Sequence, residues 1–228
     1  MIRGIMSVPH LLVDAEGAVL IDTGFPGDAA KIKRRMAALG LEPSDLKAIL
    51  LTHGHIDHAG NARELKAWSG APVFAHPLDQ PHLNGVYPYR GAARVCGALE
   101  AMARRVTRYR PVGIDVPLAD GDELPFWGGL RVVHFPGHTV GHCGFYSPRF
   151  DLLFSGDLWV RFFMRTQASP AIFTDRRELV WPSMQRAHAI GARWMVPGHY
   201  DFPDAARLRR RFEALYAERQ RRLKPVVV

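Results

Sequence analysis

The sequence contains little cysteine and no long apolar run. Cys96 and Cys143 are its only cysteines among 228 residues, too few for a disulfide framework. No stretch approaches the roughly 18 consecutive apolar residues that a membrane helix needs. The first residues also lack the apolar segment and small-residue cleavage site of a signal peptide. We therefore expect no membrane partner and a cytoplasmic location.

The composition also lacks the marks of a disordered or fibrous protein. Hydrophobic residues make up 47% and charged residues 23% of the chain, as in ordinary globular proteins. Because domains hold roughly 150 residues on average, we expect one large domain over residues 1–228. A helix over 203–223 would close this domain, and residues 83–112 would form a variable helical insert.

Acidic residues are outnumbered by basic ones. The chain has 30 Lys and Arg against 22 Asp and Glu, a formal net charge of +8. Such a charge is compatible with nucleic-acid binding, but the basic residues are spread over 31–35, 104–110 and 207–222. We expect them on solvated helix faces, with no nucleic-acid partner. Attraction of anionic small substrates is the more direct use of this charge.

Short apolar runs separated by turn residues predict many short strands and a few helices. The predicted strands are 5–13, 18–21, 48–51, 72–75, 115–118, 123–126, 130–135, 143–146, 152–154 and 194–196. The predicted helices are 28–39, 59–68, 92–108, 175–190 and 203–223. Strands grouped into hairpins, with helices between the groups, indicate two sheets packed face to face with helices outside.

The densest group of reactive side chains follows the predicted buried strand at 48–51. His53, His55, Asp57 and His58 lie within six residues of one another. Imidazole and carboxylate are the ligands of Zn²⁺ and similar divalent ions. Alternate residues of an extended loop point the same way, so His53 and His55 are placed to hold one ion. Four ligands exceed what one ion takes from a single loop, and two ions are the simplest interpretation.

Three further turns each follow an apolar strand and each carry one metal-ligating side chain. These are Pro-Gly-His-Thr at His138, Ser-Gly-Asp at Asp157 and Pro-Gly-His at His199. Each motif alone is a weak signal. Together they reinforce the histidine-rich loop, because strand ends at one edge of a sheet are where sites are built.

In this order, the motifs T-H-G-H-I-D-H-A-G, P-G-H-T, S-G-D and P-G-H resemble the metallo-β-lactamase superfamily. The D-T-G turn at Asp22 resembles an early turn of that family. The resemblance implies an α+β fold, a four-layer αββα sandwich of two mixed β-sheets with helices outside. It also implies two divalent metal ions, with Zn²⁺ expected and Fe or Mn as alternatives. The implied ligands are His53, His55 and His138 for the first ion, Asp57, His58 and His199 for the second, and Asp157 as a bridge.

The resemblance further implies a metal-dependent hydrolase. A hydroxide bridging the two ions would be the nucleophile, since a metal-bound water titrates near pH 7. Asp57 would accept a hydrogen bond from it and orient it, and Asp22 would support the ligand loops from behind. We expect a small-molecule substrate, either an ester, a thioester or a lactone.

Two departures narrow the choice within the family. The β-lactamases of the family carry Cys or Ser at the position of Asp157, which argues against β-lactam hydrolysis. Its glyoxalase II thioester hydrolases carry a helical C-terminal domain, and the residues after His199 leave little room for one, which argues against a glyoxalase II. Lactonases of acyl-homoserine lactones remain compatible. A mononuclear iron dioxygenase of the persulfide dioxygenase type, a phosphodiesterase and a non-catalytic binding protein stay open as alternatives.

Substrate contacts are the weakest signal in the sequence. Trp159, Phe162 and Tyr200 lie close to the implied ligands, and their aromatic rings are candidates for binding the substrate. Members of this family often begin with one more strand than the sequence predicts here. A sheet that lacks an edge strand can be completed by association with a second copy, so we also expect a homo-oligomer.

Overall fold

The computed structural model describes residues 1–162, 165–200 and 204–223. It contains two five-stranded sheets, each of which mixes parallel and antiparallel pairs. The first has the order β1-β2-β3-β4-β5, with β1 (His10–Asp14), β2 (Gly17–Ile21), β3 (Leu46–Leu50), β4 (Val73–Ala75) and β5 (Val116–Pro117). The second has the order β12-β9-β8-β7-β6, with β6 (Glu123–Leu124), β7 (Leu130–His134), β8 (Cys143–Ser147), β9 (Leu152–Phe154) and β12 (Trp194–Val196). The expected pair of mixed sheets is confirmed.

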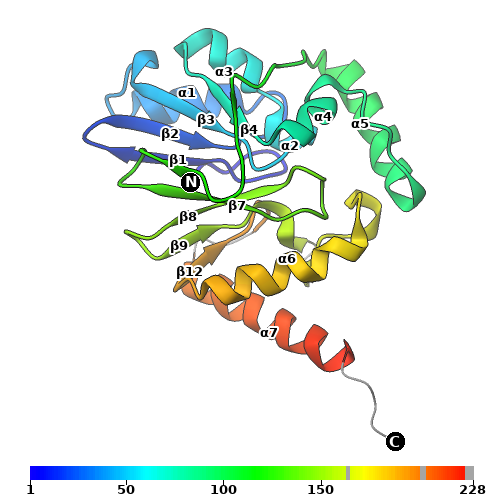
Figure 1. Ribbon diagram of the computed structural model, residues 1–228. Helices are drawn as coiled ribbons and strands as arrows, with labels where there is room; N and C mark the ends of the chain where they lie inside the picture. The colour runs from blue at the N-terminus through cyan, green and yellow to red at the C-terminus, as the bar shows by residue number, and fades with distance from the viewer. Residues whose placement is uncertain (163–164, 201–203, 224–228) are drawn as a thin grey trace, which may run out of the picture.

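Helices lie on the outer faces of the two sheets (Figure 1). The first sheet carries α1 (Ala29–Ala37) and α3 (Ala62–Ser69), and the second carries α6 (Arg177–Ile190) and α7 (Ala205–Leu223). Shorter helical segments connect the layers: η1 (Pro43–Asp45), α2 (Ile56–Ala59), η2 (Pro77–Asp79), α4 (Gln80–Asn84), η3 (Gly91–Ala93), η4 (Gly156–Leu158) and η5 (Ala171–Phe173). The expected αββα sandwich is therefore observed.

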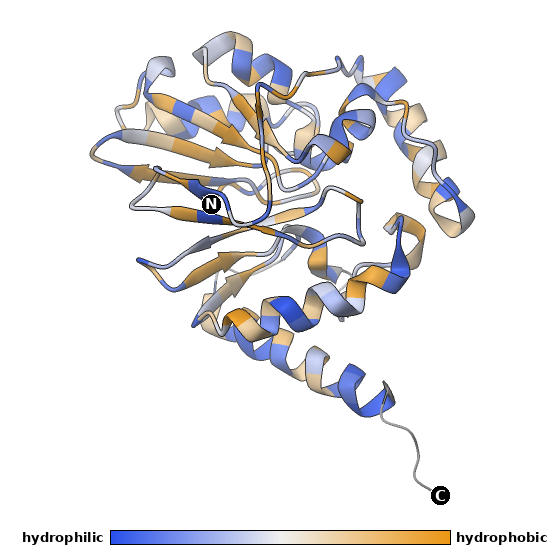
Figure 2. Cartoon of the chain, viewed as in Figure 1, coloured by the Kyte–Doolittle hydropathy of each residue, from blue (hydrophilic) through white to orange (hydrophobic). Residues whose placement is uncertain are grey.

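Alternation along the strands of the first sheet divides the core in two. Val19 and Ile21 of β2 face the second sheet, whereas Ala18 and Leu20 face the outer helices. This follows because successive side chains of a strand point to opposite faces. Figure 2 shows the apolar strands between helices that carry hydrophilic residues on their outer sides. Both faces of this sheet are buried, which explains why its strands appear in the sequence as continuous apolar runs.

Two expectations about local structure are wrong. The strand expected over 5–13 begins only at His10. The single helix expected over 59–68 is interrupted at Gly60 and Asn61 and forms α2 and α3. Gly60 packs so closely on the carbonyl of Gly24 that a Cβ there would lie 2.7 Å from its oxygen. The Asn61 amide also bonds backbone carbonyls of the same turn, so tertiary contacts at this turn interrupt the helix.

No strand or helix is predicted from the sequence between 155 and 174. After the Ser-Gly-Asp turn, however, the chain forms a separate two-stranded sheet of β10 (Trp159–Phe162) and β11 (Arg165–Ala168). Its strands pair antiparallel, with Trp159 opposite Ala168. Pairing with a segment downstream decides this structure, and such a partner is not visible in local periodicity.

The region of the expected insert contains α4, η3 and α5 (Arg94–Thr107). Helix α5 lies at the rim of the sandwich, beside α2 (Figure 1). It packs against η5 of the opposite half. The insert therefore lies across the end of the sandwich at which the ligand candidates gather.

Candidate metal centre

The seven residues predicted as ligands come from loops that follow strands of both sheets. His53, His55, Asp57 and His58 follow β3, His138 follows β7, Asp157 follows β9 and His199 follows β12. These strand ends meet at one edge of the sandwich. The structure brings the seven side chains together there in three overlapping groups.

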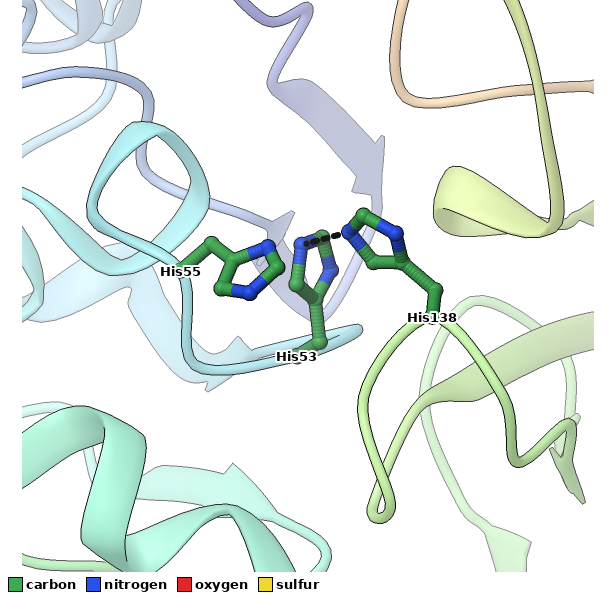
Figure 3. Close-up of side chains that lie close together, drawn as sticks. All are labelled: His53, His55 and His138. Carbon is green, nitrogen blue, oxygen red and sulfur yellow. Dashed lines mark hydrogen bonds between the residues drawn. The ribbon is translucent and has the colours of Figure 1, made fainter. Parts of the chain in front are cut away.

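The first group is formed by His53, His55 and His138, which are all buried. Figure 3 shows the three rings side by side, with His138 arriving from a separate loop. The Nε2 atoms of His53 and His138 lie 3.1 Å apart. The Nε2 atom of His55 is buried and has no hydrogen-bond partner among the described residues. Three imidazole nitrogens converging in this way are the donor set of a tetrahedral ion with one open position.

The second group lies next to the first and includes carboxylates. The Nε2 atoms of His58 and His199 are 3.2 Å apart. His199 Nε2 lies 3.1 Å from an oxygen of Asp157 and 3.2 Å from an oxygen of Asp57. Asp157 also lies 3.6 Å from His138 Nε2. Its carboxylate therefore stands between the two groups, which is the position expected for a bridging ligand.

Groups behind the site hold the histidine rings in place. Nδ1 of His58 lies 2.8 Å from an oxygen of Asp22, and Nδ1 of His53 lies 3.0 Å from the Thr52 hydroxyl. The same Asp22 carboxylate accepts the backbone N–H of Thr52 at 2.8 Å. Nδ1 of His199 bonds the carbonyl of Met6. Each of these rings thus turns its Nε2 atom toward the centre of the cluster.

Asp22 takes an unusual backbone conformation to reach this position. It is buried, and its φ of 57° lies in the left-handed region, which non-glycine residues adopt rarely and Asp more readily than most. Its carboxylate contacts both a ligand candidate and the ligand loop, and its supporting role stays a prediction.

The charges of the cluster largely balance one another. Burial and the neighbouring histidines hold the pKa values of His53 and His138 well below the ordinary range. Burial acts the same way on His58 and His199, but the carboxylates beside them, first of all Asp157, outweigh it. They raise the pKa of His58 well above its usual value and that of His199 to about 10.

The pKa values of the two carboxyl groups, Asp57 and Asp157, shift in the opposite direction, below their ordinary values. Burial raises the pKa of a carboxyl group, but the charge of His58 and a hydrogen bond from His199 lower the pKa of Asp57 to about 2. The charges of His199 and His58 hold the pKa of Asp157 well below its ordinary value. Both residues are therefore ionised acceptors at neutral pH.

Two buried acids that the sequence analysis missed fix the ligand loop. Asp79, in η2, accepts the backbone N–H of Gly54 at 2.7 Å and that of Gly141 at 2.8 Å, and so joins the ligand loops of the two sheets. Glu100, in α5, accepts the backbone N–H of Ile56 at 2.7 Å. Asp79 could have been found from the sequence, because it closely follows a short strand, as the ligand candidates do. Glu100 could not, because an acid in the middle of a helix is ordinary.

His142 adds a backbone contact from the second sheet. Its Nε2 accepts the backbone N–H of Asp157 at 2.9 Å, while its Nδ1 lies 3.1 Å from the carbonyl of Phe135. The ring is fully buried. It therefore anchors the turn that presents Asp157 and is not itself among the grouped ligand candidates.

A cavity of about 190 Å³ opens from the cluster. One end is lined by ligand candidates, and the remaining wall is largely apolar. The apolar lining consists of Met6, Phe25, Ile56, Cys96, Leu99, Ala103, Val160, Pro170 and Phe173. Within the part of the chain that the structure describes, no Lys or Arg lines this cavity. The basic residues that give the protein its net positive charge are thus absent from this lining. This is contrary to the expectation that the charge attracts anionic small substrates to the site.

The expected substrate contacts are not found where the sequence suggested. Trp159 is fully buried in the core, packs against Phe212 of α7 and does not line the cavity, so the prediction that it contacts the substrate is wrong. Tyr200 directs its hydroxyl to Nε2 of His10 at 3.0 Å and does not line the cavity. The side chain of Phe162 lies outside the described residues. Local sequence places these rings near the ligands, but strand direction turns Trp159 inward.

Comparison with known proteins assigns the family. A family model described as the metallo-beta-lactamase superfamily matches residues 4–199. The match covers most of the chain, and the protein belongs to this superfamily. The expected family and fold are confirmed, as is the general class of metal-dependent hydrolase.

Several named relatives share part of the sequence. The chain is 27% identical over 197 residues to a probable metallo-hydrolase of Bacillus subtilis, YflN, covering 79% of this chain and 74% of that protein. It is 31% identical to the hydroxyacylglutathione hydrolase GloC of Haemophilus influenzae, covering 64% of this chain and 62% of that protein. A hydroxyacylglutathione hydrolase of Cereibacter sphaeroides is 30% identical over 69% of this chain, but only 49% of that protein is matched.

Solved structures agree with the fold. A metallo-beta-lactamase family protein of Thermus thermophilus superposes with a TM-score of 0.73 and 28% identity, covering 96% of this chain and 76% of that one. The protein TTHA1623, crystallised in a di-iron-bound form, gives a TM-score of 0.69 and 28% identity, covering 93% and 96%. Among the described residues, no helix is long and apolar enough to cross a membrane.

Proposed function

We propose that this protein is a dinuclear metal-dependent hydrolase that cleaves a small, uncharged ester, thioester or lactone bearing an apolar group. One observation carries the proposal: adjoining groups of metal-ligating side chains stand at one end of a cavity whose remaining wall, Glu100 apart, is apolar. The first part of this observation supports the chemistry and the second the substrate.

The donor set fits divalent ions. The candidate ligand atoms of each group lie within 4.8 Å of one another, with three imidazole nitrogens in the first group and a carboxylate oxygen in each of the others. The buried Nε2 of His55 has no other partner among the described residues. A buried polar atom without a partner is costly unless something binds it. We assign His53, His55 and His138 to one ion, Asp57, His58 and His199 to the other, and Asp157 to both. Zn²⁺ suits this mixture, and Fe or Mn are alternatives.

Bound divalent ions supply a Lewis acid for the scissile carbonyl and lower the pKa of water at the site. The protein's own residues do the positioning. Asp57 would stay ionised beside two divalent ions, because nearby positive charge favours a carboxylate, and its oxygen would accept a hydrogen bond from the attacking water. Asp157 contributes negative charge between the two groups, which offsets repulsion between two dications. The apolar wall excludes other water and strengthens these electrostatic interactions.

The lining of the cavity supports the choice of substrate. An anionic substrate such as a glutathione thioester or a phosphodiester is normally bound by Arg or Lys, and no such residue lines the described cavity. Nine apolar side chains line it instead. A neutral carbonyl compound with an apolar substituent is the complementary ligand, and an acyl lactone or acyl ester has this character.

Two alternatives are less well supported. A mononuclear iron dioxygenase uses one ion, and the second group, Asp57, His58 and His199, would then have no purpose. A phosphodiesterase requires cationic contacts to its substrate, which the described lining does not provide.

The proposal is tested by measuring metal content together with hydrolysis. The purified protein is analysed for Zn, Fe and Mn and assayed on lactones, thioesters, carboxylic esters and phosphodiesters. We expect about two ions per chain and turnover that is highest for neutral substrates with apolar groups. The double variant His53→Ala/His55→Ala should lose a bound ion and all detectable turnover.

A matched control is His188→Ala, which removes a histidine of α6 that stacks on Tyr216, away from the cluster. It should keep metal and activity. One iron per chain with oxygen uptake, or unchanged hydrolysis in the double variant, contradicts the proposal.

A further inference from the structure

Helix α5 exposes an apolar stripe to solvent. Val95, Leu99, Met102 and Val106 are 49%, 46%, 61% and 77% exposed. Their spacing of four, three and four residues places them on one face of the helix. Scattered exposed apolar residues are ordinary, but a continuous stripe along a helix marks an interaction surface.

A row of positive charges runs beside this stripe. Arg94 and Arg105 are exposed, and at 100° per residue they lie on the side of the helix next to the stripe and away from the buried face. Arg108, the residue that ends α5, is also exposed. The only acidic residue of α5, Glu100, is buried and accepts the N–H of Ile56. The exposed surface of α5 therefore combines apolar side chains with uncompensated positive charge.

The stripe continues to the mouth of the cavity. Leu99 belongs both to the stripe and to the cavity lining. Across the opening, Met6 also lines the cavity and is 53% exposed. Ile172 of η5, next to the lining residue Phe173, is 40% exposed, and η5 contacts α5. Exposed apolar residues from three segments thus line the cavity or lie next to a residue that does.

We propose that this face, defined by Val95, Leu99, Met102, Val106, Ile172 and Met6 with the adjacent arginines of α5, docks onto the surface of an anionic lipid bilayer. An amphipathic helix with apolar residues on one face and Lys or Arg beside them is the form that binds in the plane of such a surface. The positive charge of these arginines favours an anionic bilayer over the two other partners that such a face could bind, a second copy of the chain and a nucleic acid. A second copy docked through the same face in a two-fold arrangement would bring the two arginine rows together, and a nucleic acid would leave the stripe exposed to water.

The docked geometry has a consequence that rests on the proposed function. The entrance would face the bilayer, and an apolar acyl compound dissolved in the membrane would enter the cavity past Leu99 without crossing water. The docking itself requires neither metal nor turnover, so it can fail or succeed independently of the proposed activity.

The test is co-sedimentation of the metal-loaded protein with vesicles. Phosphatidylcholine vesicles are compared with vesicles that also contain phosphatidylglycerol, at low and at high salt. The wild-type protein should bind the anionic vesicles and be released by salt. Arg94→Gln/Arg105→Gln should weaken binding roughly 30-fold, at about fivefold per charge. Met102→Gln/Val106→Gln should weaken it as well, and hydrolysis of a water-soluble substrate should not change, because neither residue lines the cavity.

A matched control is Arg34→Gln/Arg35→Gln, which removes two exposed arginines at the end of α1. It should bind like the wild type. Equal weakening by this control would mean that net charge alone drives binding and would overturn the proposal. So would failure of the wild type to bind anionic vesicles, or a dimer in sedimentation velocity that Met102→Gln/Val106→Gln converts to a monomer.

Discussion

Asp22 illustrates how a single residue outside the ligand set controls it. Its carboxylate contacts Nδ1 of His58 and the backbone N–H of Thr52, and its left-handed backbone places it there. Replacing such a partner of a ligating histidine commonly lowers metal affinity about 10- to 100-fold.

We therefore expect Asp22→Asn to lower the affinity for the ion held by His58, measured by competition with a chromogenic chelator. The loss should fall in the range of about 10- to 100-fold, with a parallel loss of turnover at limiting metal that excess metal restores. Asp14→Asn, at the end of β1 and partly exposed, serves as the control and should bind metal normally. An unaltered affinity in Asp22→Asn would contradict the supporting role.

The ligand candidates of the site could be predicted residue by residue, but the side chains that surround them could not. The ligand candidates stand out because His and Asp are unusual directly after apolar strands. Trp159 and Tyr200 have the same proximity in sequence, yet one is buried in the core and the other turns to His10. Side-chain direction depends on which strand pairs with which, and an aromatic ring suits a core as well as a pocket.

Among the elements, α5 does more than cover the cavity. Its Glu100 accepts the N–H of Ile56 at the first turn of α2, the short helix that carries Asp57 and His58. Glu100 also accepts the Tyr89 hydroxyl at 2.7 Å. The insert is thereby tied to the ligand loop by buried hydrogen bonds, which makes Glu100 a positioning residue.

Glu100→Ala should leave the Ile56 N–H without its buried partner and cost about 1–3 kcal/mol in the free energy of unfolding. We expect kcat to fall with little change in KM, because the ligand loop loses its fixed position while the apolar wall remains. Urea unfolding and steady-state kinetics measure the two effects. Glu100→Gln retains an acceptor oxygen and should recover most of the activity; equal loss in both variants would point to the charge instead.

At the scale of the whole molecule, the candidate ligands join the two sheets. Four come from the loop after β3 in the first sheet, and three follow strands of the second. Ions that bind this set stabilise the folded chain by mass action, about 4 kcal/mol when the free ion exceeds its Kd about 1,000-fold. Metal binding should therefore be linked to global stability.

Removing the metal with a chelator should lower the melting temperature on the order of 10 °C, measured by calorimetry, and adding Zn²⁺ back should restore it. His53→Ala/His55→Ala should melt at a lower temperature and respond less to the chelator. Identical melting curves with and without chelator would show that the cluster does not bind metal in the folded chain.

The single-domain organisation, the cytoplasmic location and self-association all stay predictions.

The family, most of the strands and helices, and the seven ligand candidates could be predicted from the sequence. These depend on local patterns: apolar runs set the strands, and strand-end turns rich in His and Asp set the chemistry. The character of the pocket, the buried acids that hold the ligand loop and the exposed stripe of α5 emerged from the folded chain alone. The pocket and the buried acids join residues far apart in the chain, such as Met6, Leu99 and Phe173 around one cavity, and the stripe is exposed because the opposite face of α5 packs on the rest of the fold. Two cysteines were too few for a disulfide framework, and no apolar run was long enough for a membrane helix. Neither observation could indicate an apolar surface assembled from single residues on one helix face.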